Sequence, residues 1–214
     1  MTEAKFTAGS AYYGFTVHTW NLPSGTTCPG ALHCLAYADR ATGKLRHGKE
    51  QRFRCYSATV ERYPAVRANA WANFDTCKWL TPAQLAVMLS SLLPRKATHL
   101  RIHAGGDFFS QNYFDGWLLF CAQRPELKCW AFTKSIPYWQ GRLDEVPANL
   151  TLTASLGGRH DALAEELGLR TARVVASIEE AAALGLPIDT DDALAMVPGP
   201  SFALLDKAAQ RRRA

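Results

Sequence analysis

Residues 98–133 read THLRIHAGGDFFSQNYFDGWLLFCAQRPELKCWAFT, and this stretch predicts the fold. Residues 98–104 have the composition of a strand, and the Gly-Gly-Asp at 105–107 is expected to form its exit turn. Ser110 is placed to cap a helix whose apolar residues recur at helical spacing as far as Cys121. A second strand is expected at 128–133. The stretch is therefore one strand–helix–strand unit.

The same pattern continues on both sides of this unit. Further strands are expected at 11–20, 149–154, 173–176 and 201–205, and helices at 58–79 (interrupted by Pro64), 81–93, 138–143, 161–167 and 177–185. Strands separated by helices of this length imply a parallel sheet with crossover helices. About six strands are fewer than the eight of a closed barrel, so we predict an α/β fold built as a partial (βα)6-type barrel. A doubly wound open sheet is the alternative that periodicity leaves open.

Length and composition indicate one domain over residues 1–214. The hydrophobic share of 48% and charged share of 20% are ordinary for a globular protein. No apolar run approaches the ~20 residues of a membrane helix, and the N-terminal residues lack the apolar core of a signal peptide. We therefore predict a cytoplasmic protein without membrane contact and with a frayed basic tail at 206–214. The oligomeric state is not predicted.

Three of the six cysteines lie in a loop of about residues 21–57, directly after the first expected strand. Cys28 and Cys34 are separated by five residues, and Cys55 follows after a polar, basic excursion. Clustered cysteines in a reducing compartment are typical of metal or redox sites. Since thiolates select zinc or iron–sulfur clusters, we predict that Cys28, Cys34 and Cys55 hold a metal centre, with a 4Fe–4S cluster favoured. Unrelated core or surface thiols are the alternative.

The remaining three cysteines have other expected roles. Cys121 and Cys129 lie on an apolar helix face and inside a strand, where a free cysteine behaves as a small hydrophobe. Cys77 follows a helical segment and is the spare thiol that could complete a four-ligand site.

Ligands of parallel α/β proteins bind outside the carboxyl ends of the strands. The residues that follow the expected strands there, and that we predict to bind a cofactor, are His103, Gly105, Gly106, Asp107, Lys134 and Ser155. Three of them have a simpler alternative: a structural role for His103, a turn cap for Asp107 and a solvated side chain for Lys134. Together they predict a small-molecule pocket beside the cysteine loop.

Several short motifs occur in one order along the chain. They are Cys-Pro-Gly-Ala-x-x-Cys at 28–34, Phe-Arg-Cys-Tyr at 53–56, Arg-x-His-x-x-Gly-Asp-Phe-Phe-Ser at 101–110, Phe-Thr-Lys-Ser at 132–135 and Leu-Thr-Ala-Ser-x-Gly-Gly at 152–158. In this order they resemble the phage- and plasmid-encoded gene product 88 family over roughly residues 20–205. The resemblance implies a phage or mobile-element protein that acts in the bacterial cytoplasm.

A more distant resemblance is to the radical S-adenosylmethionine superfamily. Its partial barrel carries a three-cysteine loop for a 4Fe–4S cluster after the first strand, and a Gly-Gly-Glu-type turn after the second binds the amino group of S-adenosylmethionine. Here the cysteine loop and then Gly105-Gly106-Asp107 follow the same order, although gaps of five and twenty residues replace the superfamily's three and two. The resemblance implies S-adenosylmethionine as a candidate ligand at an open iron. It leaves a radical enzyme and a non-enzymatic iron–sulfur protein as equal alternatives.

The basic stretch 44–54 indicates a second class of function. Phe53 and Tyr56 lie within or beside it, and cationic and aromatic groups together suit single-stranded nucleic acid. The formal net charge of +5 permits an anionic partner without requiring one. The alternative prediction is therefore a zinc-stabilised or metal-free phage protein that binds nucleic acid or a host protein without catalysis.

Overall fold

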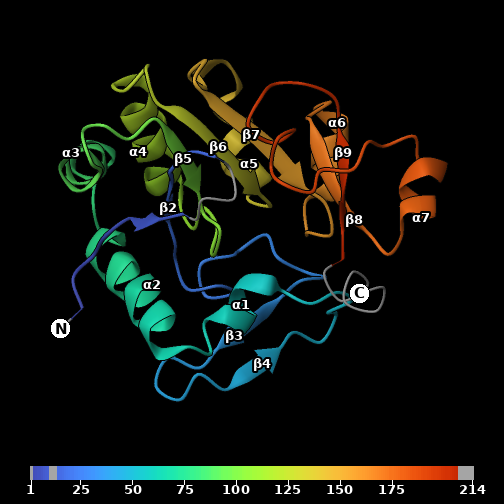
Figure 1. Cartoon of the computed structure of the whole chain (residues 1–214), viewed down its shortest axis with the longest axis horizontal. Helices are drawn as coiled ribbons and strands as arrows, with labels where there is room; N and C mark the ends of the chain where they lie inside the picture. Colours follow the sequence, from blue (N-terminus) through green and yellow to red (C-terminus); the bar gives the residue numbers. More distant parts are fainter. Residues whose placement is uncertain (1, 10–13, 207–214) are drawn as a thin grey trace.

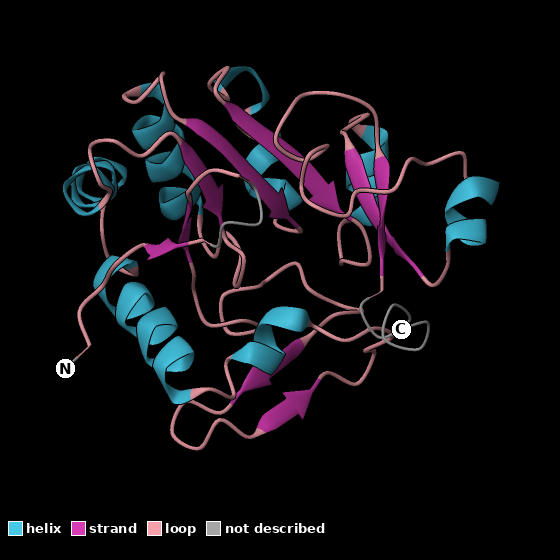
Figure 2. Cartoon of the chain, in the orientation of Figure 1, coloured by secondary structure: helices cyan, strands magenta, loops and turns pink. Residues whose placement is uncertain are grey.

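The computed structural model describes residues 2–9 and 14–206, and its centre is a seven-stranded sheet (Figures 1 and 2). The strands, in spatial order, are β1 (Thr7–Ala8), β2 (Val17–Trp20), β5 (His99–Ile102), β6 (Lys128–Thr133), β7 (Leu150–Ser155), β8 (Thr171–Val175) and β9 (Phe202–Leu205). β1 pairs antiparallel with β2, and all the other pairs are parallel. Since β1 and β9 form the two edges, the sheet is open.

The order of the parallel strands separates the two predicted architectures. From β2 to β9 the strands lie side by side in the order in which they occur along the chain. A doubly wound sheet reverses its strand order part-way and carries helices on both faces. The prediction of a parallel α/β sheet with crossover helices is confirmed, the doubly wound alternative is wrong, and barrel closure is not seen.

Four helices share one face of the sheet. α3 (Pro82–Leu92), α4 (Gln111–Ala122), α5 (Ile136–Gln140) and α6 (Asp161–Glu166) contribute to one hydrophobic core with inward residues of β5, β6 and β7. Leu100 and Leu152 from the sheet and Trp117 from α4 belong to this core. On the other face Trp130 and Phe202 pack with Ala195 from the segment that precedes β9. α7 (Ile178–Ala183) is a fifth helix on the helical face, where Ala181 packs against Val175 of β8 and Ala203 of β9.

Local signals for helix ends are confirmed. The Thr81 hydroxyl accepts a hydrogen bond from Gln84 N at 3.3 Å, and Gln84 Oε1 accepts one from Thr81 N at 3.0 Å, so the capping box opens α3. Ser110 caps α4 through Tyr113 N at 3.2 Å. Gly168 takes the left-handed conformation after α6, with a φ of 62°. A 3-10 turn, Leu143–Glu145, follows α5.

The segment that contains the first three cysteines is more structured than predicted. It holds the hairpin β3 (Ala36–Ala38) and β4 (Leu45–His47), then α1 (Tyr56–Val60) and α2 (Pro64–Cys77). The hairpin replaces part of the expected loop because strands of three residues are too short for alternation to show in the sequence. The predicted break at Pro64 is confirmed, since α2 begins there.

Two expectations reach beyond the described residues. Of the strand predicted at 11–20 only Val17–Trp20 is a strand, and residues 11–13 lie outside the described part of the chain. The tail at 207–214 also lies outside it. Among the described residues, no helix has the length and apolar character needed to cross a membrane.

Candidate functional site

The cysteine-bearing segment lies across the carboxyl ends of the parallel strands. Its backbone is tied to the exits of β5 and β7: Leu22 N donates to Gly105 O at 2.9 Å, and His33 N donates to Gly157 O at 2.9 Å. Arg159 N donates back to Gly30 O at 2.8 Å. In Figure 1 this segment runs below the arrowheads of β5, β6 and β7. The edge predicted to bind a ligand is therefore the edge that carries the cysteines.

Glycines allow this close approach. A Cβ on Gly30 would collide with the carbonyl oxygen of Lys134, and a Cβ on Gly105 would collide with the hydroxyl of Ser57. Gly106 has a φ of 86°, and a Cβ there would lie 2.6 Å from Cβ of Leu22. The space in front of Gly105 and Gly106 is thus occupied by the chain's own cysteine segment. Cofactor contact by these two glycines stays a prediction.

Cys28, Cys34 and Cys55 are free thiols that lie near one another. Burial raises the pKa of each, and the charges of Cys34 and Cys55 add to the rise of the pKa of Cys28. The sulfur of Cys28 accepts a hydrogen bond from Gly25 N at 3.3 Å, and the sulfur of Cys55 accepts one from Ala58 N at 3.4 Å. The fold thus brings together three thiols that are distant in sequence, two of which receive backbone hydrogen bonds.

The three cysteines do not form a ready-made site for one metal ion. Within the described residues, no group of three or more His, Cys, Asp or Glu side chains could hold a single metal ion. A structural zinc site needs four ligands on one tetrahedron at about 2.3 Å from the metal. The cluster at Cys28, Cys34 and Cys55 therefore stays a prediction.

Asp107, Lys134 and Ser155 form one buried network beside the cysteines. Asp107 Oδ1 accepts a hydrogen bond from the Thr133 hydroxyl at 2.6 Å, and Asp107 Oδ2 accepts one from Lys134 N at 2.8 Å. Lys134 Nζ donates to the carbonyl oxygen and hydroxyl of Ser155 at 2.6 and 2.8 Å, and to Leu156 O at 2.7 Å. The structure therefore brings these three predicted residues together.

The network is electrostatically linked to the thiols. Burial raises the pKa of Asp107 to about 6, although its hydrogen bonds act in the opposite direction. The charge of Asp107 helps to raise the pKa of Cys28, whereas the charge of Lys134 lowers the pKa of Cys34. Lys134 is thus a buried cation placed close enough to act on a buried thiol.

The comparisons with known proteins give one match. The model of the family described as gene product 88 matches residues 2–214. The chain belongs to the gene product 88 family. This confirms the first resemblance, while the resemblance to the radical S-adenosylmethionine superfamily finds no support there. No curated protein and no solved structure matches the chain.

His103 is not gathered with the other predicted residues. It has a φ of 63°, and its ring stacks on Tyr113 and lies edge-on to Phe108 and Trp117 in the core under α4. Its Nε2 lies 2.9 Å from the Tyr113 hydroxyl. Burial lowers the pKa of His103 to about 3, so the ring is neutral near pH 7. The surroundings are those of a core histidine, and its contact with a cofactor stays a prediction.

Cys77 is likewise placed away from the candidate centre. It is buried in the main hydrophobic core, and burial raises the pKa of its thiol to about 12. Cys121 and Cys129 belong to the same core, as predicted. The structure therefore gives no support to Cys77 as a fourth ligand.

Sequence reasoning missed Glu61. Its side chain is only 2% exposed, and Oε1 accepts a hydrogen bond from Ser24 N at 2.8 Å. Oε2 has no hydrogen-bond partner among the described residues. Burial raises the pKa of Glu61, and its charge raises the pKa of Cys55. Glu61 thus joins the start of the Cys28 loop to the helix that follows Cys55, a link over 37 residues with no local sequence signal.

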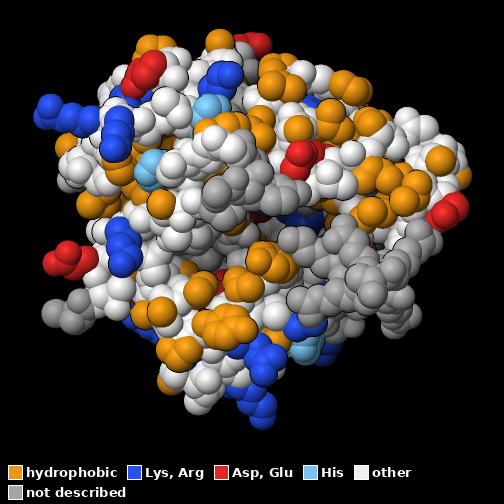
Figure 3. All heavy atoms as spheres, in the orientation of Figure 1, with side chains coloured by type: hydrophobic (Ala, Val, Ile, Leu, Met, Phe, Trp, Pro, Cys, Tyr) orange, Lys and Arg blue, Asp and Glu red, His pale blue; other side chains and the backbone are white. Residues whose placement is uncertain are grey.

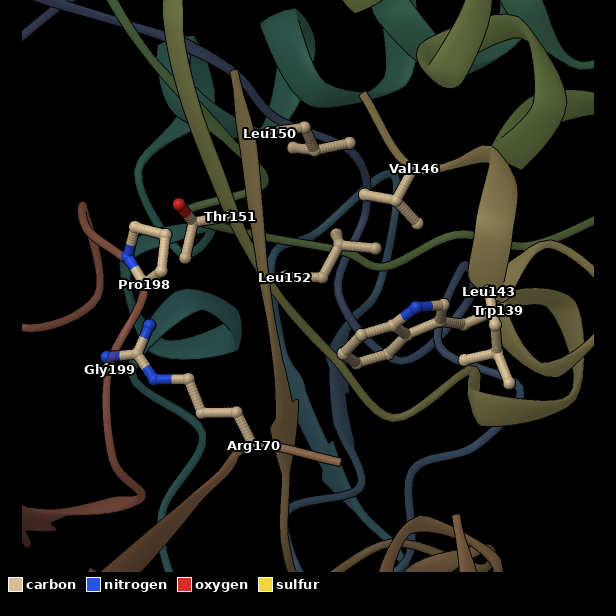
Figure 4. Close-up of a pocket in the computed structure, with 9 residues that line it drawn as sticks. All are labelled: Trp139, Leu143, Val146, Leu150, Thr151, Leu152, Arg170, Pro198 and Gly199. Atoms are coloured by element: carbon tan, nitrogen blue, oxygen red, sulfur yellow. The ribbon is translucent and has the colours of Figure 1, made fainter. Parts of the chain in front are cut away.

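A separate groove lies at the opposite end of β7. Its volume is about 320 Å³, and Figure 4 shows Trp139 and Leu143 on one side of it and Arg170 and Pro198 on the other. The Arg170 guanidinium donates to Leu194 O, Val197 O and Pro200 O. Because those donors are used within the chain, the groove offers a ligand little beyond an apolar wall.

Proposed function

We propose that the chain is an iron–sulfur protein whose 4Fe–4S cluster is bound by Cys28, Cys34 and Cys55. The observation that carries this proposal is the convergence of three free thiols, electrostatically linked, over the carboxyl edge of a parallel sheet. Ligands of parallel α/β proteins bind at that edge. The other three cysteines, by contrast, lie in the hydrophobic core.

Hydrogen-bond donors and a nearby cation support a cluster at these three thiols. Without a metal, burial favours the neutral thiols, as their raised pKa values indicate. A bound cluster would convert them to thiolates and supply the positive charge that they need. Lys134 would add one buried cation beside Cys34, and the amides of Gly25 and Ala58 would donate to two of the sulfurs.

Three protein thiolates would leave the fourth iron free to bind a small molecule. We propose a molecule with amino and carboxylate groups, such as S-adenosylmethionine, in contact with Asp107, Lys134 or Ser155. Support comes from the strand order and from Asp107, which ends the turn after the second parallel strand. If binding is followed by chemistry the protein is an enzyme; otherwise it is a non-catalytic iron–sulfur protein.

The experiment is anaerobic reconstitution with iron and sulfide, followed by absorbance and electron paramagnetic resonance spectroscopy. We expect brown protein with a broad absorbance near ~400 nm from thiolate-to-iron charge transfer. Addition of S-adenosylmethionine to the reduced sample should change the resonance spectrum if the fourth iron is open. Colourless protein that holds stoichiometric zinc and no iron would overturn the cluster and favour the zinc-stabilised alternative. An intact cluster whose spectrum is insensitive to S-adenosylmethionine would overturn only the ligand.

A further inference from the structure

The exposed side of the β3–β4 hairpin concentrates the positive charge of the protein. Residues 39–62 hold seven of the 24 lysines and arginines and three of the 19 acidic residues. One of those acids, Glu61, is buried, and another, Asp39, accepts hydrogen bonds from Ala41 N and Thr42 N in its own turn. Figure 3 shows lysine and arginine side chains along the lower edge of the molecule, where Figure 1 places β3 and β4.

Pairing in the hairpin places a ring among these cations. Tyr37 of β3 lies directly opposite Arg46 of β4, so both side chains point to the same side. Lys44, which directly precedes β4, is exposed like Arg46. The neighbours of Tyr37, Ala36 and Ala38, are buried on the other side. One side of the hairpin is therefore basic and aromatic, and the other is packed against the protein.

The chain after β4 extends this surface. Gly48 N donates to Leu35 O at 2.8 Å and Arg52 N donates to His33 O at 2.8 Å, so residues 48–52 run back along residues 33–35. Lys49 and Arg52 are exposed there. We call Tyr37, Lys44, Arg46, Lys49 and Arg52 the basic hairpin surface. Among the described residues, these four cations form one ion pair, that of Arg46 with Asp39 at 3.8 Å, which leaves most of their charge available to a partner.

Exposed tyrosines distinguish the partner class. The exposed fractions are 36% for Tyr37, 54% for Tyr56, the first residue of α1, and 67% for Tyr63, which is the N-cap residue of α2. Cations neutralise phosphates, but a flat exposed ring stacks on a base only if the base is unpaired. An acidic peptide would pair with the cations but would offer no flat base on which the tyrosine rings could stack. We propose that the basic hairpin surface binds single-stranded nucleic acid, a property that does not depend on the cluster.

The test is fluorescence anisotropy of the full chain with labelled oligo-dT and oligo-U of about 20 nucleotides, longer than the roughly 4–16 nucleotides of a typical single-strand site. If the four cations of the surface each neutralise one phosphate, affinity should fall roughly 50-fold between about 50 and about 200 mM salt. Comparison of the two oligomers shows which of the two nucleic acids the surface prefers. A duplex of the same length should bind more weakly.

Two variants of equal charge make the test specific. Lys44, Arg46, Lys49 and Arg52 changed to Ala, and the exposed Arg95, Lys96, Lys128 and Arg173 changed to Ala, each lower the formal net charge from +5 to +1. We expect the first variant to lose binding and the second to retain it within about threefold, and Tyr37→Ala to weaken binding at least about fivefold. Circular dichroism checks that each variant is folded. Equal losses in both charge variants, unchanged binding in the first, or preference for duplex or for poly-glutamate would overturn the proposal.

Discussion

The six cysteines divide into two groups of three, and the regions that hold them differ in kind. Cys77, Cys121 and Cys129 lie in the hydrophobic core between helices and sheet. The other three lie on the segment that crosses the carboxyl edge, partly exposed and beside buried charges. The core thiols pack as small apolar side chains would. The edge thiols lie where a parallel sheet binds its ligands.

This difference shows that the place of a cysteine in the topology determines its surroundings here. At the edge, Gly30 and Gly105 allow the cysteine segment to pack closely against the residues that follow the strands, and Lys134 supplies a buried charge. In the core, the three thiols share one hydrophobic cluster with large side chains such as Trp117 and Phe114. Substitutions of cysteines in the core should therefore lower stability, whereas substitutions of cysteines at the edge should abolish metal binding.

The largest effect on stability is expected at Lys134. Lys134→Met keeps the length of the side chain but removes the donors to Ser155 and Leu156, which leaves buried oxygens without partners. The free energy of unfolding should fall by about 3 kcal/mol in urea denaturation, because hydrogen bonds to charged groups are strong and buried orphans are costly. Lys128→Met, at the exposed start of the same strand, is the control and should change it by less than about 0.5 kcal/mol. An equal fall in the free energy of unfolding for both variants would contradict a stabilising role of the buried Lys134 charge.

A smaller, pH-dependent effect is expected at His103. The pKa of the His103 ring is 6.5 in the unfolded chain, and burial lowers it to about 3 in the folded protein. Between these two pH values the ring is protonated in the unfolded state and neutral in the folded state. The contribution of His103 to the free energy of unfolding is fully present above pH 6.5 and is lost as the pH falls toward 3. Between pH 6.5 and about pH 5 the wild type should lose about 2 kcal/mol relative to His103→Asn, which tolerates the φ of 63°.

The contribution of Asp107 to stability changes with pH in the opposite direction to that of His103. The effect of His103 is therefore measured by comparing the wild type with the His103→Asn variant. The pKa of Asp107 is raised from 3.8 to about 6, so its contribution is present below pH 3.8 and is lost as the pH rises through 6. The two groups partly cancel in the wild type, and the variant exposes the Asp107 slope. Parallel pH profiles of unfolding for wild type and His103→Asn would show that His103 is not a core residue.

The smallest effect is expected at Glu61. Glu61→Ala leaves Ser24 N without its acceptor and should lower the free energy of unfolding by about 1–2 kcal/mol. Glu61→Gln keeps an oxygen for Ser24 and should cost less than the alanine variant. Thermal denaturation of the two variants side by side measures this. Equal destabilisation by both would assign the role to the carboxylate charge and not to the link between the cysteine segments.

The sequence predicts the parts of this protein that depend on local signals. The unit at residues 98–133, the capping box at Thr81 and the left-handed Gly168 each depend on neighbours a few residues away. The parts it does not predict depend on contacts over long separations. Ser24 meets Glu61 across 37 residues, and Ser57 lies so close to Gly105 that a side chain there would collide with it. The direction of the His103 side chain follows from a positive φ that composition does not reveal.

Iron and sulfide content after anaerobic reconstitution tests the central claim most directly, with each cysteine changed in turn. The account predicts about four irons per chain in the wild type. Cys28→Ser, Cys34→Ser and Cys55→Ser should each lose the iron and the absorbance, whereas Cys77→Ala, Cys121→Ala and Cys129→Ala should keep the iron and lose only stability. Full iron in any edge variant, or loss of iron in a folded core variant, would contradict the account.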